Sequence, residues 1–308
     1  MKKLFNTLDV FTEERFGGNP LAVVHQADDL TGEQMQTIAR EFNLSETIFI
    51  LNAEREEHRA KVRIFTPSAE LPFAGHPTVG AACLLAEIDA EAMASEGLQA
   101  LDSHLLVLEE GIGPVRCAVT LEDDRAAFAT FELAKLPSPH AHVPDIAAIA
   151  LAHGLEVTDI GFEDHKPSGF NAGMPYLCVP VRDLEAVRRA ELNSSAWNAT
   201  FADETTGSTF LYTRECVRHD GDFHARMFAP NHGISEDPAT GSAVASFAGA
   251  IMRFDTPTVG THDYLIEQGY EMGRPSVLHL GLDVESATLK TARIAGHAVR
   301  VSEGLLTV

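Results

Sequence analysis

The chain repeats itself at about half its length, and this repeat constrains its fold more than any other feature. RIFTP at 63–67 recurs 163 residues later as RMFAP at 226–230. Three further matches keep the same order and a similar offset. They join 19–24 with 174–179, 45–49 with 207–211, and the small-residue segments 75–86 with 238–252. The alternative explanation is a chance similarity between short sequences that are common in β-strands. Four ordered matches predict two duplicated halves.

Within the first half, local signals predict regular elements. Thr31 opens the amphipathic segment 31–42, and Gln34 follows three residues later, as in a capping box. We therefore expect a helix over 31–42 that is capped by Thr31. The segments 47–51 and 60–65 are apolar or alternating and predict two strands.

The small-residue segment of each half has no polar face. Residues 76–86 and 239–252 are apolar on all sides, and a helix of this kind is buried. Because strands precede and follow it, each half is expected to be a sheet wrapped around one central helix, which makes the chain α+β. Prolines and a shift in composition at 136–140 place the linker there, giving domains 1–136 and 137–308.

Composition excludes several classes of partner. The chain has 23 Lys and Arg against 45 Asp and Glu, a formal net charge of −22, which repels phosphate backbones and argues against nucleic acid. No apolar run approaches the ~20 residues needed to cross a bilayer, so no membrane association is expected. The first residues lack the apolar region of a signal peptide, which predicts a cytoplasmic protein. The four cysteines are widely spaced without CxxC, so neither a disulfide framework nor a zinc site is expected.

The loops before the two central helices are the candidate binding site. The first N–H groups of a helix lack partners within it, and its dipole favours an anion, so we expect a carboxylate or phosphate near Gly75 or Gly241. If a pseudo-twofold axis relates the halves, the two helix ends face each other across a cleft. The alternative for each loop alone is structural, with Asp237 as an N-cap and His76 as a satisfied loop histidine.

Four motifs together resemble a known family. FGGNPLAVV at 16–24, NLSET at 43–47, FTP followed by ELPFAGHPT at 65–78, and EDPATGSA at 236–243 resemble, in this order, the PhzF family of phenazine-biosynthesis-like isomerases. The resemblance covers essentially the whole chain. It implies the diaminopimelate epimerase-like fold: two pseudo-symmetric lobes, each a mostly antiparallel curled sheet around a central helix. In such a fold, the extreme C-terminal strand can pack against the first lobe.

The resemblance also implies an activity and a site. Its best-known member isomerises a dihydro-hydroxyanthranilate by moving a proton along a conjugated ring acid. The family works without a cofactor, commonly as a homodimer, with its active site in the cleft between the lobes. The acid/base glutamate of the family falls on Glu46. Its substrate-binding loops fall on Gly75 and His76 in the first half, and on Asp237 and Ser242 in the second.

Other functions are alternatives to this isomerase. Glu46 taken alone could be a solvated turn residue, and a non-catalytic small-ligand- or protein-binding protein of the same fold is the main alternative. An amino-acid epimerase or racemase is less favoured, because a two-thiol mechanism needs a cysteine in each helix loop and neither loop has one. The closest histidine pairs, His140 with His142 and His219 with His224, lack metal-ligand spacing, so they are expected to be solvated surface histidines and no metal is expected. Residues 111–116 resemble a dinucleotide fingerprint weakly and fit the start of a strand better. P-loop and GxSxG motifs are absent.

Overall fold

The computed structural model describes residues 1–308 except 100, 123–124, 141–142 and 202–207. The chain forms two compact units, one of Met1–Glu132 with Ala295–Val308 and one of Leu133–Ile294. The sequence placed the boundary at 136–137 and a linker at 136–140. In the structure, residues 138–140 form a strand of the second unit that pairs with a later strand, so they are not a free linker. No described helix is long and apolar enough to span a bilayer.

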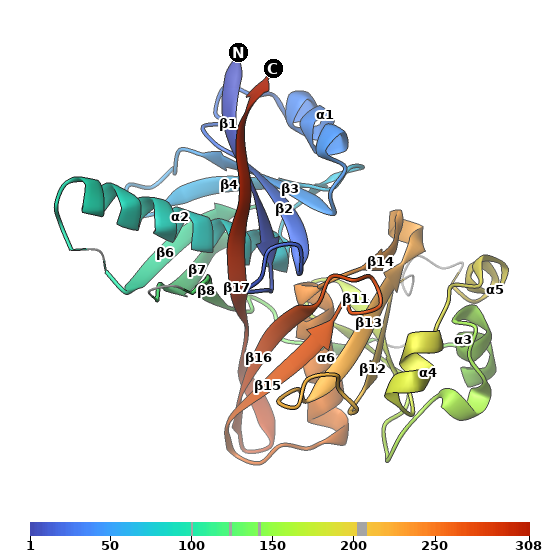
Figure 1. Ribbon diagram of the computed structural model, residues 1–308. Helices are drawn as coiled ribbons and strands as arrows, with labels where there is room; N and C mark the ends of the chain where they lie inside the picture. Colours follow the sequence, from blue (N-terminus) through green and yellow to red (C-terminus); the bar gives the residue numbers. More distant parts are fainter. Residues whose placement is uncertain (100, 123–124, 141–142, 202–207) are drawn as a thin grey trace. The chain divides into compact units, whose positions relative to one another are not determined.

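The first unit is a mostly antiparallel sheet with two helices (Figure 1). In chain order its elements are β1 (Lys2–Val10), β2 (Asn19–Val24), α1 (Gly32–Phe42), β3 (Glu46–Leu51), β4 (Ala60–Phe65), β5 (Glu70–Leu71), α2 (Gly75–Ser95), β6 (Ser103–Glu110), β7 (Gly113–Thr120) and β8 (Ala127–Glu132). Antiparallel pairs join β1 to β2, β3 to β4, β4 to β5, β6 to β7 and β7 to β8, whereas β2–β3 and β4–β6 are parallel.

The second unit repeats this pairing pattern. Its elements are β9 (Ser138–His140), α3 (Ile146–Ala152), η1 (Val157–Asp159), β10 (Ser168–Asn171), β11 (Pro175–Pro180), α4 (Leu184–Arg189), α5 (Ser194–Thr200), β12 (Thr209–Thr213), β13 (Phe223–Ala229), η3 (Pro230–His232), β14 (Ile234–Asp237), α6 (Gly241–Phe254), β15 (Gly260–Gln268), β16 (Ser276–Glu285) and β17 (Thr288–Thr307). Pairs β10–β11, β12–β13, β13–β14 and β15–β16 are antiparallel, and β11–β12 and β13–β15 are parallel. Strand for strand, this is the order of β1 to β7.

Strand β17 begins in the second unit and ends in the first. There it pairs antiparallel with β1, from Lys2 opposite Thr307 to Val10 opposite Ala298. The two chain ends therefore lie side by side, and Val308 N donates to the carbonyl of Met1 at 2.8 Å (Figure 1).

The local predictions for α1 and its neighbouring strands are confirmed. Thr31 caps α1 and forms the full capping box with Gln34. Asn43 ends the helix in the left-handed conformation, with φ 51°. The strand predicted over 60–65 is β4, and the one predicted over 47–51 is β3, which begins one residue earlier at Glu46.

Both central helices form where the apolar segments predicted them. In its own unit, α2 packs against β1, β2, β3, β6, β7 and β8, and α6 packs against β9, β10, β11 and β16. The predicted end of the first helix, at 86, was wrong because α2 continues to Ser95. Residues 75–86 are all buried, while the remainder bears acidic residues among alanines. That part stays helical by propensity after burial ends.

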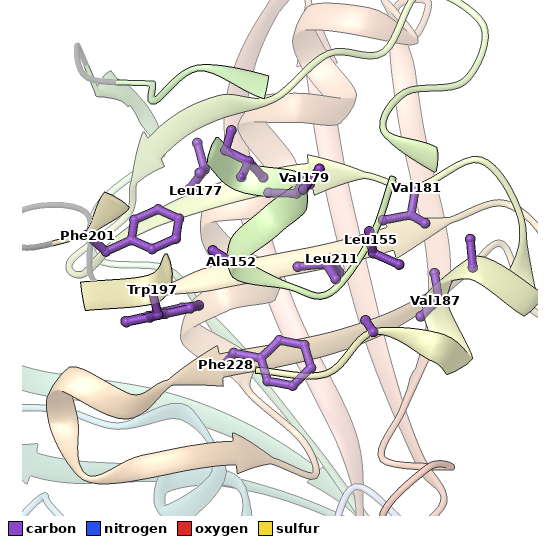
Figure 2. Packing of buried hydrophobic residues seen from close by; sticks show 14 residues of the cluster. Ala152, Leu155, Leu177, Val179, Val181, Val187, Trp197, Phe201, Leu211 and Phe228 are labelled. Atoms are coloured by element: carbon purple, nitrogen blue, oxygen red, sulfur yellow. The ribbon is translucent and has the colours of Figure 1, made fainter. Parts of the chain in front are cut away.

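The second unit also has a helical layer over its sheet. Figure 2 shows Trp197, Phe201 and Phe228 packed with aliphatic residues of β11 and β12 in one buried cluster. His153 lies against this aromatic group and bonds to Thr209 at 2.9 Å. Burial lowers the pKa of His153 to about 4, so it is a neutral part of the core.

Candidate active site

The first unit places Glu46 beside His76. Glu46 is the first residue of β3, and His76 is the second residue of α2. Nδ1 of His76 lies 3.1 Å from Oε2 of Glu46, and the two side chains are 5% and 14% exposed. The alternative of a solvated turn glutamate is therefore wrong.

The His76 ring is neutral. Burial lowers its pKa to about 3, against a smaller opposing effect of a hydrogen bond to the backbone of Pro20. A carboxylate only accepts hydrogen bonds, so with Glu46 ionised the contact requires the proton to be on Nδ1. Nε2 is then the unprotonated nitrogen, and it is buried without a hydrogen-bond partner among the described residues. His76 is thus not the satisfied loop histidine of the structural alternative.

The N-terminus of α2 is held from inside the unit. Its N-cap, Ala74, has no side chain that can accept from the helix, and Gly75 follows as the first helical residue. Oγ1 of Thr78 lies 2.8 Å from the Ala74 carbonyl and 2.8 Å from Oε1 of the buried Glu110. Neither Thr78 nor Glu110 was singled out in the sequence, because buried polar residues of a core have no motif of their own.

In the second unit, Asp237 is not a helix cap. It is the last residue of β14, it is buried, and its Oδ2 accepts from the Thr240 hydroxyl at 2.6 Å. The N-cap of α6 is Thr240, which makes no side-chain capping bond. The structural alternative for Asp237, a helix N-cap, is therefore wrong. Its carboxylate accepts a hydrogen bond from Thr240 within the loop before α6.

Gln268 holds this loop and was missed by sequence analysis. Its Nε2 donates to the Asp237 carbonyl at 2.7 Å and to Oγ1 of Thr240 at 3.1 Å, while its Oε1 accepts from the Thr240 backbone N–H at 3.2 Å. The side chain is fully buried. No sequence signal could have found it, because Gln268 comes some 30 residues after the loop.

Ser242 and Gly241 open α6, as expected. The Ser242 hydroxyl lies 2.8 Å from the hydroxyl of Tyr176 on β11. Tyr176 is buried, and its hydroxyl orients that of Ser242. Gly241 is buried at the first helical position.

The repeated RxFxP word has a structural role in both units. Arg63 pairs with Glu70 through two bonds of 2.6 and 2.7 Å between β4 and β5. Arg226 pairs with Glu236 through two bonds of 2.7 and 2.9 Å between β13 and β14. Each arginine thus ties its strand to the short strand that leads toward a central helix.

The expectation of a surface position was wrong for His224 and is confirmed for its neighbour His219, which is exposed. His224 is buried between Glu267, at 2.6 Å from Nδ1, and Glu271, at 3.1 Å from Nε2, and these carboxylates raise its pKa above the ordinary value despite burial. His165 is buried beside Asp255. Of the 140–142 pair, residues 141–142 lie outside the described chain. Within the described ranges, no group of three or more His, Cys, Asp and Glu has the geometry of a metal site.

The cysteines lie away from both helix loops. Cys83, Cys117 and Cys178 are buried and free, and burial raises the pKa of Cys117 to about 12. Cys216 is partly exposed and also free.

Comparison with known proteins identifies the family of the chain. A family profile described as "Phenazine biosynthesis-like protein", PhzC-PhzF, matches residues 8–304. The chain belongs to the PhzC-PhzF family. An uncharacterised isomerase of Mesorhizobium japonicum is 50% identical over 303 residues, covering 97% of each chain. The trans-2,3-dihydro-3-hydroxyanthranilate isomerase of Pseudomonas aeruginosa is 30% identical and covers 96% of each chain. The protein is accordingly an isomerase of this family.

Solved structures show the same fold. A PhzF family protein of Bacillus anthracis covers 100% of each chain with a TM-score of 0.86 at 26% identity. A probable proline racemase of Agrobacterium radiobacter covers 99% of this chain and 92% of its own, with a TM-score of 0.61 at 12% identity. This second likeness shows only that the mixed α+β fold is shared.

Proposed function

We propose that this PhzC-PhzF protein is a cofactor-independent isomerase that moves a proton within a small, cyclic or conjugated carboxylate, with Glu46 as its acid/base. The observation that carries the proposal is the contact between Glu46 and a neutral His76 at the N-terminus of a buried helix. A neutral imidazole orients the carboxylate without adding a positive charge that would weaken it as a base.

In the proposed reaction, the Glu46 carboxylate removes a proton from an acidic carbon and the electron pair moves into the conjugated system. The protonated Glu46 then returns the proton to a second carbon of the same molecule, so no atom is gained or lost. This requires one base that reaches both carbons, and the repeat supports a single base. Glu46 opens β3, whereas the equivalent strand of the second unit opens at Thr209, after Ser208.

The other site residues are assigned to binding. Gly75 and His76 at α2, and Asp237, Gly241 and Ser242 at α6, are proposed to hold the polar groups of the substrate. The partnerless N–H groups of a helix N-terminus suit a substrate carboxylate. We further propose that the two units are the pseudo-symmetric lobes of this fold, each a sheet curled around its own central helix.

The test is turnover in D₂O by the parent and by Glu46→Gln. Trans-2,3-dihydro-3-hydroxyanthranilate, on which the P. aeruginosa relative is named to act, is the first substrate, followed by other cyclic and amino-acid carboxylates. Gln keeps the shape of Glu46 but cannot accept a proton, so turnover should fall by about 10²–10⁴-fold while ligand binding is retained. Glu33→Gln, on the exposed side of α1, is the matched control and should behave as the parent.

Two outcomes contradict the proposal. Equal turnover and equal deuterium incorporation by the parent and Glu46→Gln would remove Glu46 from the mechanism. Ligand binding by the parent without any turnover or deuterium uptake over the whole panel would favour the non-catalytic alternative.

A further inference from the structure

The Thr78 hydroxyl contacts two oxygens beneath the first turn of α2, and with Glu110 ionised there is only one proton for the two contacts. The Thr78 hydroxyl has a single hydrogen, yet Oγ1 lies 2.8 Å from two oxygens, the Ala74 carbonyl and Oε1 of Glu110. A carbonyl oxygen and a carboxylate oxygen can both only accept, so with Glu110 ionised the single hydroxyl proton of Thr78 cannot complete both bonds. Both contacts are complete hydrogen bonds when Glu110 is protonated, because its carboxyl group then donates to Oγ1 and the Thr78 hydroxyl donates to Ala74.

The surroundings of Glu110 also require a neutral group. The residue is 7% exposed, and its Oε2 has no hydrogen-bond partner among the described residues. A carboxylate would leave one of its charged oxygens buried without a protein donor, which is more costly than leaving a neutral carbonyl oxygen unpaired. Burial raises the pKa of Glu110 to about 8, more than offsetting the opposite effect of the Thr78 hydroxyl.

Among the described residues, no charged neighbour offsets the effect of burial on Glu110. Glu110 lies on the buried face of β6 with Leu106 and Leu108, and its side chain contacts Thr78 of α2. Among the buried residues described for β7 and α2, the titratable ones are Cys117 of β7 and Cys83 and His76 of α2. All three are neutral near pH 7, since burial raises the pKa of both thiols and lowers that of His76.

The charged residues of the neighbouring strands lie on the other face of the sheet. Lys61 and Arg63 alternate with the buried residues of β4, and they pair with Glu54 and Glu70. Glu109, which adjoins Glu110 in β6, pairs with His58.

The residue is placed where it can control the loop that carries the site. The turn after Glu110 packs on the segment leading into α2: the Ile112 N–H donates to the Pro72 carbonyl at 3.1 Å. A Cβ on Gly111 would lie 2.8 Å from the Pro72 Cα. Ala74, at the end of the proton chain, immediately precedes Gly75 and His76.

We propose that Glu110 is a protonated positioning residue: its carboxylic acid donates to Thr78, Thr78 donates to Ala74, and this relay holds the first turn of α2 so that His76 stays against Glu46. The inference rests on the proposed function for its catalytic consequence only. Ionisation of Glu110 removes the first donor of the relay and loosens that turn.

The experiment has two readouts that need no substrate. Infrared difference spectra between the parent and Glu110→Gln should show a carboxylic acid C=O band at pH 7 that is replaced by carboxylate bands at pH 9. The ¹⁵N signal of the His76 ring, assigned by its loss in His76→Asn, should shift in the parent with a midpoint near pH 8. That shift should be lost in Glu110→Gln and in Thr78→Val, and kept in Thr78→Ser, which retains the hydroxyl.

The outcomes separate the two proposals. Carboxylate bands of Glu110 already present at pH 7, or a His76 shift near pH 8 that persists in Glu110→Gln, would overturn the relay. If Glu110→Gln does not fold, the parent spectra at pH 7 and pH 9 and the Thr78 pair still decide. With a substrate that the parent converts, kcat/KM of the parent should fall above pH 8. The kcat/KM of Thr78→Val should not show this fall. Failure to find any substrate would count against the proposed function and leave both spectroscopic results standing.

Discussion

At the scale of single residues, the balance between burial and neighbouring carboxylates decides which histidines carry a charge. His76 and His224 are both buried, but their environments differ. His76 touches one carboxylate and its pKa falls to about 3, whereas His224 lies between two and its pKa rises. Desolvation dominates in the first case, and the two acidic partners outweigh it in the second. His76 is therefore suited to orient Glu46, while His224 is suited to join β13 to the end of β15.

The lowered pKa of His76 predicts a specific pH dependence of stability. The unfolded chain binds a proton on this ring below about pH 6.5, whereas the folded chain stays neutral down to about pH 3. Stability therefore falls as pH is lowered through this window. Relative to His76→Asn, the free energy of unfolding of the parent should drop by up to about 1.4 kcal/mol per pH unit below pH 6.5.

Urea denaturation at pH 7, 6 and 5 measures this difference. His219→Asn, at an exposed position, is the control and should follow the parent at every pH. Parallel curves for the parent and His76→Asn would show that the ring is not buried as a neutral group.

At the scale of elements, the two central helices set the fold of their units. Each is rich in small residues and is surrounded by strands of its own unit. Close approach is part of this packing, since a Cβ on Gly249 would lie 2.3 Å from the Phe170 ring. These helices also present Gly75 and Gly241 at their first turns, so the packing that stabilises each unit also positions its candidate site.

A charge inside a central helix should unfold its unit. Val244 of α6 is 0% exposed, and Val244→Asp places an unpaired carboxylate in the core, at a cost of about 3–5 kcal/mol. Val79→Asp tests α2 in the same way. Thermal melts measure the loss, with Val259→Asp, at a position 70% exposed, as the control expected within about 0.5 kcal/mol of the parent. Val244→Asp melting like its control would refute the assignment of α6 as a buried helix.

At the scale of the whole molecule, the chain closes on itself through its ends. The last part of β17 pairs along the full length of β1, and Leu306 and Val308 pack against the buried cluster around Phe49. The first unit is thus built from both ends of the chain and is complete only after synthesis of the C-terminal residues.

Removal of residues 295–308 should destabilise the first unit. The truncated chain loses the strand that covers β1, which leaves an unpaired edge and an open apolar cluster. We expect the first unit to melt at least about 10 °C lower, corresponding to several kcal/mol. A synthetic peptide of residues 295–308, added to the truncated chain, should restore the transition in calorimetry. An unchanged melt without the peptide would show that the C-terminal strand is dispensable.

Short-range patterns determined much of this protein from sequence alone. The capping box of Thr31 and Gln34, the apolar helices and the strands at 47–51 and 60–65 depend on contacts within a few residues, and the repeat depends only on similarity. The family motifs likewise depend on residues close together, and they pointed to Glu46, His76 and Asp237. The roles of these residues remain proposals that the experiments above test.

Only the tertiary structure decided which side chains meet. Glu110 reaches Thr78 from 32 residues away, Gln268 reaches Asp237 from 31, and the acidic partners of His224 lie on β15 and in the turn that follows it. It also decided that α2 runs on to Ser95 and that β17 returns to the first unit. Such contacts carry no period or spacing along the chain, because they arise from how separate elements pack. The charge of a buried group depends on the same packing and so cannot be read before the fold is known.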